Sequence, residues 1–269
     1  MIHSRKKILS VIFVLFILLN SAFTVNTEAA SKKVTVYVVT SIQKNTSSND
    51  HYFYRYNEDG LLIQSKHLIY EYDGNKLKKQ TNRYGKSVNS DRKYEYNSKG
   101  QLIKHSGPVD KIKNHSYVSH VTGYYKFSYN GGGRIKKIKA YTGFCDEIAT
   151  ITYNSKKKIS KISDTIYTDT ERYTNTSKYY YDKKGYVRKL EYTSGDDNKK
   201  SVKIYKNTYD KNDCVVKIEV STKGYEKTDV YKLTYKKMKV PASYKKTIEN
   251  QQMALIPTGV YLGYYNFGD

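Results

Sequence analysis

Five lysines recur at one position of a repeated sequence motif, eight residues after a tyrosine that is usually followed by Asn or Asp. They are Lys104, Lys137, Lys161, Lys189 and Lys217. If successive copies lie side by side, equivalent positions fall about 10 Å apart, which is two strand spacings. Such a row attracts a linear polyanion, and neighbouring tyrosines could stack on sugars or bases. The alternative role is protective, because lysines on exposed strands block aggregation between sheets.

The other residues that could do chemistry form no recognised constellation. His115 and His120 are five residues apart in an expected loop, a spacing that fits no common zinc pattern. We expect all five histidines after the N-terminal segment to be solvated loop residues: His51, His67, His105, His115 and His120. The sequence holds no Gly-x-Ser-x-Gly elbow and no phosphate-binding glycine loop, and Asp196-Asp197 lacks Gly-spaced partner ligands. We therefore expect no catalytic residues, no metal ion and no cofactor.

The two cysteines, Cys145 and Cys214, allow one disulfide in an exported chain. A bridge would close a loop of about 70 residues and would stabilise the fold by at most roughly 4 kcal/mol. The two residues occupy different positions, since Cys145 precedes a strand that ends at Tyr153 and Cys214 follows the turn after Tyr209. These positions allow either a disulfide between the two cysteines or two free thiols.

About eight copies of a β-hairpin phrase must position these side chains. The anchor dipeptides are Tyr56-Asn57, Tyr72-Asp73, Tyr96-Asn97, Tyr129-Asn130, Tyr153-Asn154, Tyr181-Asp182, Tyr209-Asp210 and a degenerate Tyr235-Lys236. An apolar residue two positions before most anchor tyrosines shares a strand face with the tyrosine. The Asn or Asp then opens a type I turn by accepting a hydrogen bond from the backbone two residues on. In four copies a Gly three residues later closes the hairpin in the left-handed conformation.

The copies differ in the turn and in the strand that follows it. Asp213 replaces the glycine in the seventh copy, and Lys157 in the fifth copy predicts a strained or differently shaped turn. The second and eighth copies are one residue shorter, before Leu77 and Val240. Aliphatic residues lie six and nine residues after the anchor tyrosines. These offsets have opposite parity, so the second strand either contains a bulge or is covered on both faces.

The phrase resembles the tyrosine-aspartate (YD) repeats of the Rhs family and similar short hairpin repeats of exported bacterial proteins. The match covers residues 52–240. The resemblance implies an antiparallel spiral or curved sheet of hairpins, often linked to surface or carbohydrate contact. The chain is far too short for a toxin-enclosing shell, lacks a Pro-rich self-cleavage motif and shows no separate toxin module, so toxin delivery is not expected.

The first 30 residues are typical of a secretory signal peptide. Arg5, Lys6 and Lys7 precede an apolar run over residues 8–23, and Ala29 and Ala30 offer cleavage sites. An uncleaved anchor is the alternative, although the run is shorter than the roughly 20 residues that a spanning helix needs. Cleavage would remove three basic residues and one acidic residue, which changes the net charge from +23 to +21.

Composition favours a folded β-protein with anionic partners. The positive charge suits cell-wall polymers, nucleic acid, acidic glycans or anionic lipid, while a solubilising role for lysine is the alternative. The chain has 31 tyrosines, which favour strands and can form a core with their hydroxyls left in water.

The two ends of the exported chain are expected to frame the repeats. Val34, Val36 and Val38 alternate in a first strand. Residues 243–256 predict a short helix with Ser243 as N-cap, ended by Pro257, and residues 260–267 would cap the last hairpin. We expect an all-β fold: an antiparallel array of about eight β-hairpins, as a curved sheet or spiral. It would form a single domain over residues 31–269, with a C-terminal cap from about 241.

The leading hypothesis is a secreted, non-enzymatic repeat protein that binds an anionic or carbohydrate polymer at the cell wall or outside the cell. The alternative is an exported structural or protein-protein interaction module. We expect no specific nucleic-acid partner and no membrane span after signal cleavage.

Overall fold

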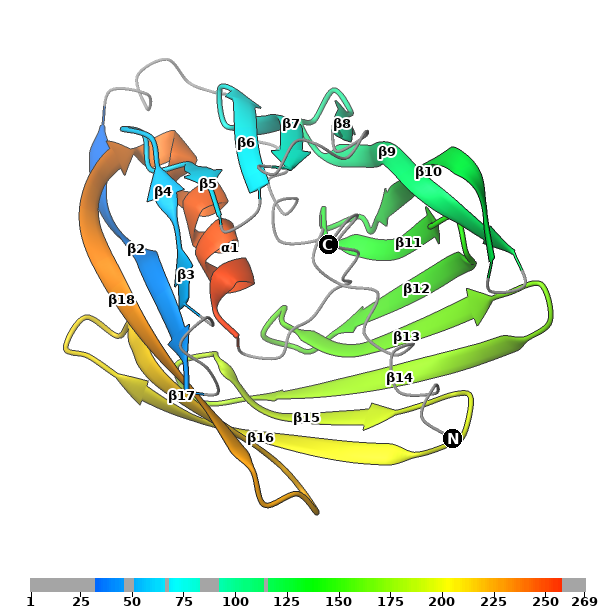
Figure 1. Cartoon of the computed structure of the whole chain (residues 1–269). Coiled ribbons are helices and arrows are strands. Elements are labelled where there is room, and N and C mark those ends of the chain that lie inside the picture. Colours follow the sequence, from blue (N-terminus) through cyan, green and yellow to red (C-terminus); the bar gives the residue numbers. More distant parts are fainter. Residues whose placement is uncertain (1–31, 46–50, 66–67, 83–91, 114–115, 258–269) are drawn as a thin grey trace.

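The computed structural model describes residues 32–45, 51–65, 68–82, 92–113 and 116–257. Within them the chain forms one antiparallel sheet whose strands follow one another in chain order and whose last strand pairs with the first. Figure 1 shows the sheet curving around the helix α1 (Lys245–Leu255). The predicted all-β array of antiparallel hairpins is confirmed, and it is closed. The expected signal segment and residues 260–267 lie outside the described residues.

The first part of the sheet contains β2 (Lys33–Lys44), β3 (His51–Phe53), β4 (Arg55–Tyr56), β5 (Leu62–Gln64), β6 (Leu68–Asp73), β7 (Lys76–Asn82), β8 (Arg92–Tyr96) and β9 (Leu102–Lys113). The second part contains β10 (Ser116–Tyr129), β11 (Ile135–Tyr141), β12 (Asp146–Tyr153), β13 (Ile159–Tyr167), β14 (Arg172–Tyr181), β15 (Val187–Thr193), β16 (Lys200–Tyr209), β17 (Val215–Thr222) and β18 (Thr228–Pro241). A short 3-10 turn, η2 (Ala242–Tyr244), precedes α1. The turns that follow the anchor tyrosines lie at one end of the sheet, which we call the anchor end, and the remaining hairpin turns lie at the far end.

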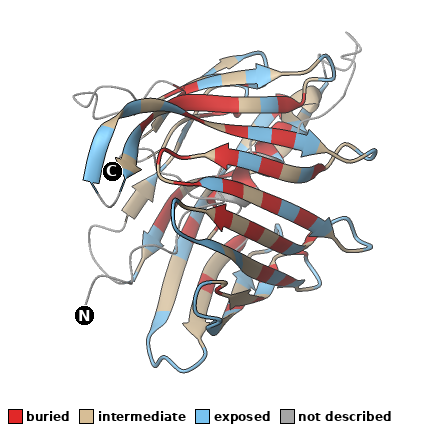
Figure 2. Ribbon diagram, turned by 90° about the vertical axis from the view of Figure 1, so that its right-hand side faces the viewer, coloured by how far each residue is buried: buried red, intermediate tan, exposed pale blue. Residues whose placement is uncertain are grey.

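A bulge in the second strand of each hairpin explains the parity of the aliphatic residues. Tyr129 pairs with Ile135 and Ser128 pairs with Lys137, so Lys136 is the extra residue. Ile135 and Ile138 therefore both face the interior and are fully or almost fully buried. The same shift accompanies Tyr56, Tyr72, Tyr96, Tyr153, Tyr181 and Tyr209. Figure 2 shows the resulting bands of buried and exposed residues along the strands.

The anchor-end turns follow the predicted chemistry with one difference. The side-chain oxygen of Asn130 accepts from the N–H of Arg134, four residues on, at 3.0 Å. The expected acceptance from two residues on occurs as well at Asn97 and Asp210. Left-handed residues close the turns at the expected places, including Asp213 at φ 62° and Lys157 at φ 64°. The Lys157 turn keeps the common hydrogen bonds, so it is strained rather than differently shaped.

The first strand completes the eighth hairpin and closes the sheet. Tyr235 pairs with Val39 and Thr234 pairs with Ser41, which leaves Thr40 as the extra residue of the usual bulge. Val39 thus takes the place of the aliphatic residue that, in the other copies, lies six residues after the anchor tyrosine and pairs with it. The expected short eighth copy before Val240 is therefore wrong, because β18 continues to Pro241 without turning. This also explains why Tyr235 is followed by Lys236, since no turn needs an Asn there.

The anchor tyrosines bind each hairpin to the one before it. Their hydroxyls were expected to lie in water, but the hydroxyl of Tyr153 donates to the carbonyl of Ile135 in the preceding hairpin at 2.8 Å. Equivalent bonds to the equivalent carbonyl are made by Tyr56, Tyr72, Tyr96, Tyr129, Tyr181 and Tyr235. Tyr209 differs, since its hydroxyl donates to the carboxylate of Asp182. We call this set the tyrosine ring.

Helix α1 completes two positions of the tyrosine ring. The amide oxygen of Gln252 accepts from the N–H of Val39 at 2.6 Å, and its amide nitrogen donates to the hydroxyl of Tyr56 at 3.3 Å. Tyr56 in turn donates to the carbonyl of Val39. Gln251 forms the equivalent triad with Leu62 and Tyr72.

The predicted C-terminal helix is confirmed, but two details of its placement differ. Its N-cap is Tyr244 rather than Ser243, and no side chain caps it. It packs against the first strands through the fully buried Ile248, which joins a cluster with Val36, Val38 and Leu61. A helix that joins β18 to the first strands reinforces the seam where the sheet closes.

Candidate functional site

The five predicted lysines all lie on the outer face of the sheet. Lys137 alternates with the buried Ile138, and its cross-strand neighbours are Ser128 and Thr150. Lys104, Lys161, Lys189 and Lys217 occupy the same position after the bulge in their own hairpins. The structure therefore arranges them as one row around the outside, which we call the first lysine row.

Part of the first lysine row is neutralised by glutamates. The ammonium group of Lys104 lies 2.7 Å from Glu95, and that of Lys189 lies 2.5 Å from Glu191. Lys217 is paired with Glu219. Within the described ranges, Lys137 and Lys161 take part in no ion pair.

A second lysine row lies across the seams between hairpins. It stands three residues before the anchor tyrosines and consists of Lys93, Lys126, Lys178, Lys206 and Lys232. Four lysine pairs are opposed across neighbouring strands: Lys79/Lys93, Lys104/Lys126, Lys161/Lys178 and Lys217/Lys232. The recurrence of a lysine three residues before the anchor tyrosines was visible in the sequence. Which lysines face each other across two strands depends on the register between neighbouring hairpins, and the connections that set this register vary.

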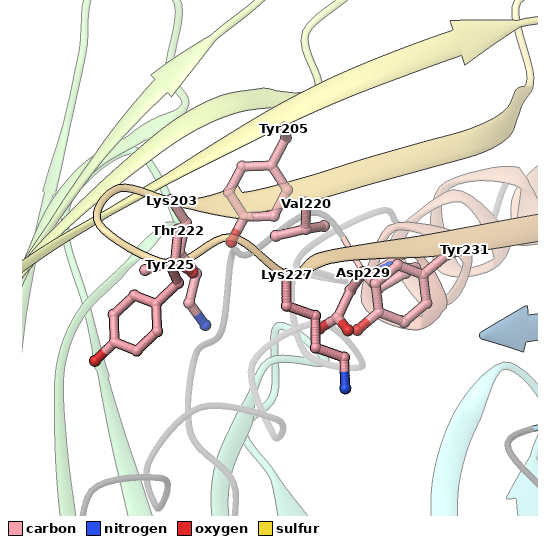
Figure 3. Close-up of a pocket in the computed structure, with 9 residues that line it drawn as sticks. Lys203, Tyr205, Val220, Thr222, Tyr225, Lys227, Asp229 and Tyr231 are labelled. Carbon is pink, nitrogen blue, oxygen red and sulfur yellow. The ribbon is translucent and has the colours of Figure 1, made fainter. Parts of the chain in front are cut away.

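A pocket of about 200 Å³ lies at the far end of the interior (Figure 3). Its lining comes from β16, β17 and β18, from the turn between β17 and β18, and from Pro257, which follows helix α1. The lining residues are Lys203, Tyr205, Val220, Thr222, Tyr225, Lys227, Asp229, Tyr231 and Pro257. Nothing in the sequence pattern joins these residues, because the pocket forms only where the ends of three strands meet the segment after α1.

The pocket has an excess of positive charge. Asp229 forms an ion pair with Lys44, at 3.1 Å. Lys203 takes part in no ion pair of the described part of the chain, and burial lowers the pKa of its ammonium group, against the raising effect of Asp229. Two lysines, Lys203 and Lys227, therefore line the pocket, while its one carboxylate, that of Asp229, already forms an ion pair with Lys44.

Two buried acids occupy the inner face of neighbouring strands near the far end. Asp164 and Glu147 are 7% and 2% exposed, on β13 and β12. Burial raises the pKa of Asp164 to about 7. The thiol of Cys145 donates to Glu147 at 3.3 Å. These groups form a buried polar cluster on the inner face of the sheet.

The histidines do not converge on a site. His105 is 1% exposed rather than solvated, and its ring stacks on Tyr94 at a centroid distance of 4.7 Å. Burial, followed by the charge of Arg92, holds the pKa of His105 well below its ordinary value. His120 lies 2.7 Å from Asp110 on an exposed hairpin. His67 and His115 lie outside the described residues, and among the described ones no three His, Cys, Asp or Glu side chains gather as metal ligands.

Cys145 and Cys214 are both buried, with free thiols. Cys145 lies in the turn between β11 and β12 at the far end, whereas Cys214 lies in the turn between β16 and β17 at the anchor end. Opposite ends of the sheet therefore hold the two thiols in this fold.

These features define the class of the molecule as a closed antiparallel sheet of β-hairpin repeats. The solved structures that it resembles include a porin-like protein from Bacteroides vulgatus, 11% identical, with a TM-score of 0.57 over 74% of this chain and 98% of that chain. A porin-like protein from Bacteroides uniformis is 14% identical, with a TM-score of 0.47 over 75% of this chain and 96% of that chain. A Photorhabdus luminescens Tc holotoxin pore structure is 14% identical, with a TM-score of 0.29 over 69% of this chain and 12% of that chain.

At these identities the likeness concerns the fold alone, and only the first structure is similar enough to support it. No family model matches the chain, and no curated protein matches it. Among the described residues, no helix has the length and apolar character needed to cross a membrane.

Proposed function

We propose that the chain is an exported, non-enzymatic β-hairpin repeat protein that binds a linear anionic polymer along its two lysine rows. The ligand class is an anionic cell-wall polymer or an acidic glycan outside the cell. The N-terminal segment with Arg5, Lys6, Lys7 and the following apolar run supports export.

The observation that carries the proposal is the set of opposed lysine pairs. Like charges directly opposite each other destabilise a sheet. Four such pairs recur at seams between hairpins. Glutamates pair with one member of two of them, Lys104 and Lys217, whereas Lys161 and Lys178 face each other with no ion pair among the described residues. A polyanion that follows the outer face would neutralise the lysines that no glutamate pairs with, and it would gain affinity from released counterions.

Closure of the sheet weakens the protective explanation for these lysines. Lysine guards the unpaired edges of open sheets, whereas a closed sheet has no such edge. The first and last strands pair here over residues 33–44 and 231–241. The lysines face outward from paired strands, so edge protection does not account for their recurrence.

Replacing Lys126, Lys178 and Lys232 together by Gln is expected to weaken binding to immobilised heparin without unfolding the protein. Each lost contact removes one released counterion, so the slope of log affinity against log salt should fall by about two to three. Stability should stay equal or rise slightly, because three like-charge contacts are relieved.

The matched control replaces Lys99, Lys156 and Lys211, exposed lysines of the anchor-end turns, by Gln. It has the same net charge, and we expect it to keep most of the wild-type affinity and slope. Equal losses in the two triple variants would show that net charge alone governs retention, and the proposed site would be wrong.

A structural or protein-interaction role is the second candidate. The β9–β10 hairpin carries Tyr117 and Val118, which are 56% and 52% exposed. Exposed apolar side chains of this kind are frequent at protein interfaces. Capture of one protein partner that is lost on replacing both residues by Ser, with heparin affinity unchanged, would favour this role.

A further inference from the structure

The far-end pocket offers a cationic and aromatic lining that the lysine rows do not share. Lys203 and Tyr205 enter it from β16, and Asp229 and Tyr231 enter it from β18 (Figure 3). Its volume of about 200 Å³ lies below the roughly 300–1,000 Å³ of sites for drug-sized molecules. The pocket therefore suits one ring-sized unit rather than a long molecule.

Lys203 indicates the charge of that unit. Its ammonium group lines the pocket and is partly removed from water. Burial lowers the pKa of Lys203, and the charge of Asp229 offsets this effect only in part. The nearby Asp229 is engaged by Lys44 at 3.1 Å. Lys227 adds a second ammonium group to the lining. The lining thus holds two ammonium groups and one carboxylate, which Lys44 shares, and an anionic group placed among them would balance the excess positive charge.

The aromatic residues indicate the remaining chemistry of the unit. Tyr225, in the turn between β17 and β18, is 68% exposed and lies at the edge of the group of lining residues (Figure 3). Tyr205 is 5% exposed and forms part of the inner lining. A tyrosine offers a flat apolar face together with a hydroxyl that can donate and accept. Such a surface suits a ring with apolar faces and polar edges, which describes a sugar.

We propose that the far-end pocket binds a single sugar residue that carries one anionic group, a carboxylate or a phosphate. Lys203 binds the anionic group, Lys227 supports it, and Tyr225 covers one face of the ring. The site is separate from the lysine rows, because it lies on the interior side of β16, β17 and β18 while the rows lie outside. A monosaccharide can occupy it without spanning the rows, so the two proposals can fail independently.

Calorimetric titration of the full protein with glucuronate, glucose 6-phosphate and glucose tests the site. We expect the two charged sugars to bind with a dissociation constant of about 1 mM, and glucose at least about tenfold more weakly. Glucuronate binding without glucose 6-phosphate binding would assign a carboxylate, and the reverse would assign a phosphate. Equal affinity for glucose and the charged sugars, or no binding of either charged sugar, would overturn the proposal.

Variants locate the binding. Lys203→Gln is expected to raise the dissociation constant of the charged sugar by at least about tenfold, because its main counter-charge is lost. Lys200→Gln is the matched control, since it removes an exposed charge of the same strand that belongs to neither lysine row, and it should leave the constant unchanged. Tyr225→Ser changes an exposed turn residue and should weaken binding several-fold even if Lys203→Gln folds poorly. Unchanged binding in Tyr225→Ser and Lys203→Gln would contradict the assignment.

Discussion

Replacing Gln251 and Gln252 together by Leu is expected to lower the free energy of unfolding by about 2–6 kcal/mol. Each substitution leaves one strand N–H, that of Leu62 or Val39, buried without its acceptor, at a cost of about 1–3 kcal/mol each. Leucine keeps the helix propensity and the apolar packing of the positions, so the loss reports the hydrogen bonds. Urea unfolding followed by tyrosine fluorescence measures the change.

Lys246→Leu serves as the control for that variant. It introduces the same residue on the exposed side of α1, where we expect a change within about 0.5 kcal/mol. If the double variant lost no more stability than this control, α1 would not hold the seam between β18 and the first strands.

The second large effect is expected from the tyrosine ring. Replacing Tyr129, Tyr153 and Tyr181 by Phe should lower the free energy of unfolding by about 3 kcal/mol, at about 1 kcal/mol for each lost hydrogen bond. The bonds are 2.6–2.8 Å long and end on strand carbonyls of the preceding hairpins. Tyr225→Phe, at an exposed tyrosine, should change little. A triple variant as stable as Tyr225→Phe would contradict the ring.

The same hydroxyls should make the protein sensitive to alkali. Burial raises the pKa of Tyr129 and Tyr181 above the ordinary value and that of Tyr153 to about 12. The unfolded state therefore loses these protons near pH 10 while the folded state keeps them. Stability is complete below pH 10 and falls above it, by up to about 1.4 kcal/mol per pH unit for each tyrosine. The triple variant should lose stability less steeply than the wild type between pH 10 and 12.

The hairpins were predictable from the sequence because their signals are local. Asn130 and Gly133 flank a turn whose geometry depends on four consecutive residues, and Ile135 follows within two more. The sequence allowed either a bulge in the second strand or a strand covered on both faces. Only the pairing of the two strands distinguishes these alternatives, because Lys136 looks like any exposed strand residue.

Closure and the tyrosine ring were not predictable in the same way. Val39 pairs with Tyr235 from the other end of the chain, and its only local sign is the missing Asn after that tyrosine. The hydroxyl of Tyr153 ends on a backbone carbonyl, which every residue has, so no residue type marks the acceptor. For this reason the expectation that the anchor-tyrosine hydroxyls lie in water was wrong.

The lysine rows lie between these cases. The first row followed from counting forward from each anchor, and counting backward by three would have revealed the second. Whether Lys161 faces Lys178 depends on how the β13–β14 hairpin sets the pairing of its two strands, and that register is not written in any single residue. Sequence therefore predicts the residues of the site, and the register between hairpins determines their arrangement.

The measurement that tests the polymer-binding claim most directly is the affinity of the wild-type protein for heparin fragments of increasing length, at two salt concentrations. The five positions of the first lysine row span about 40 Å, as four intervals of two strand spacings. We expect fragments of that length to bind at least about tenfold more tightly than a tetrasaccharide, and this difference to shrink as salt rises. Affinity that is independent of both length and salt would contradict binding along the rows.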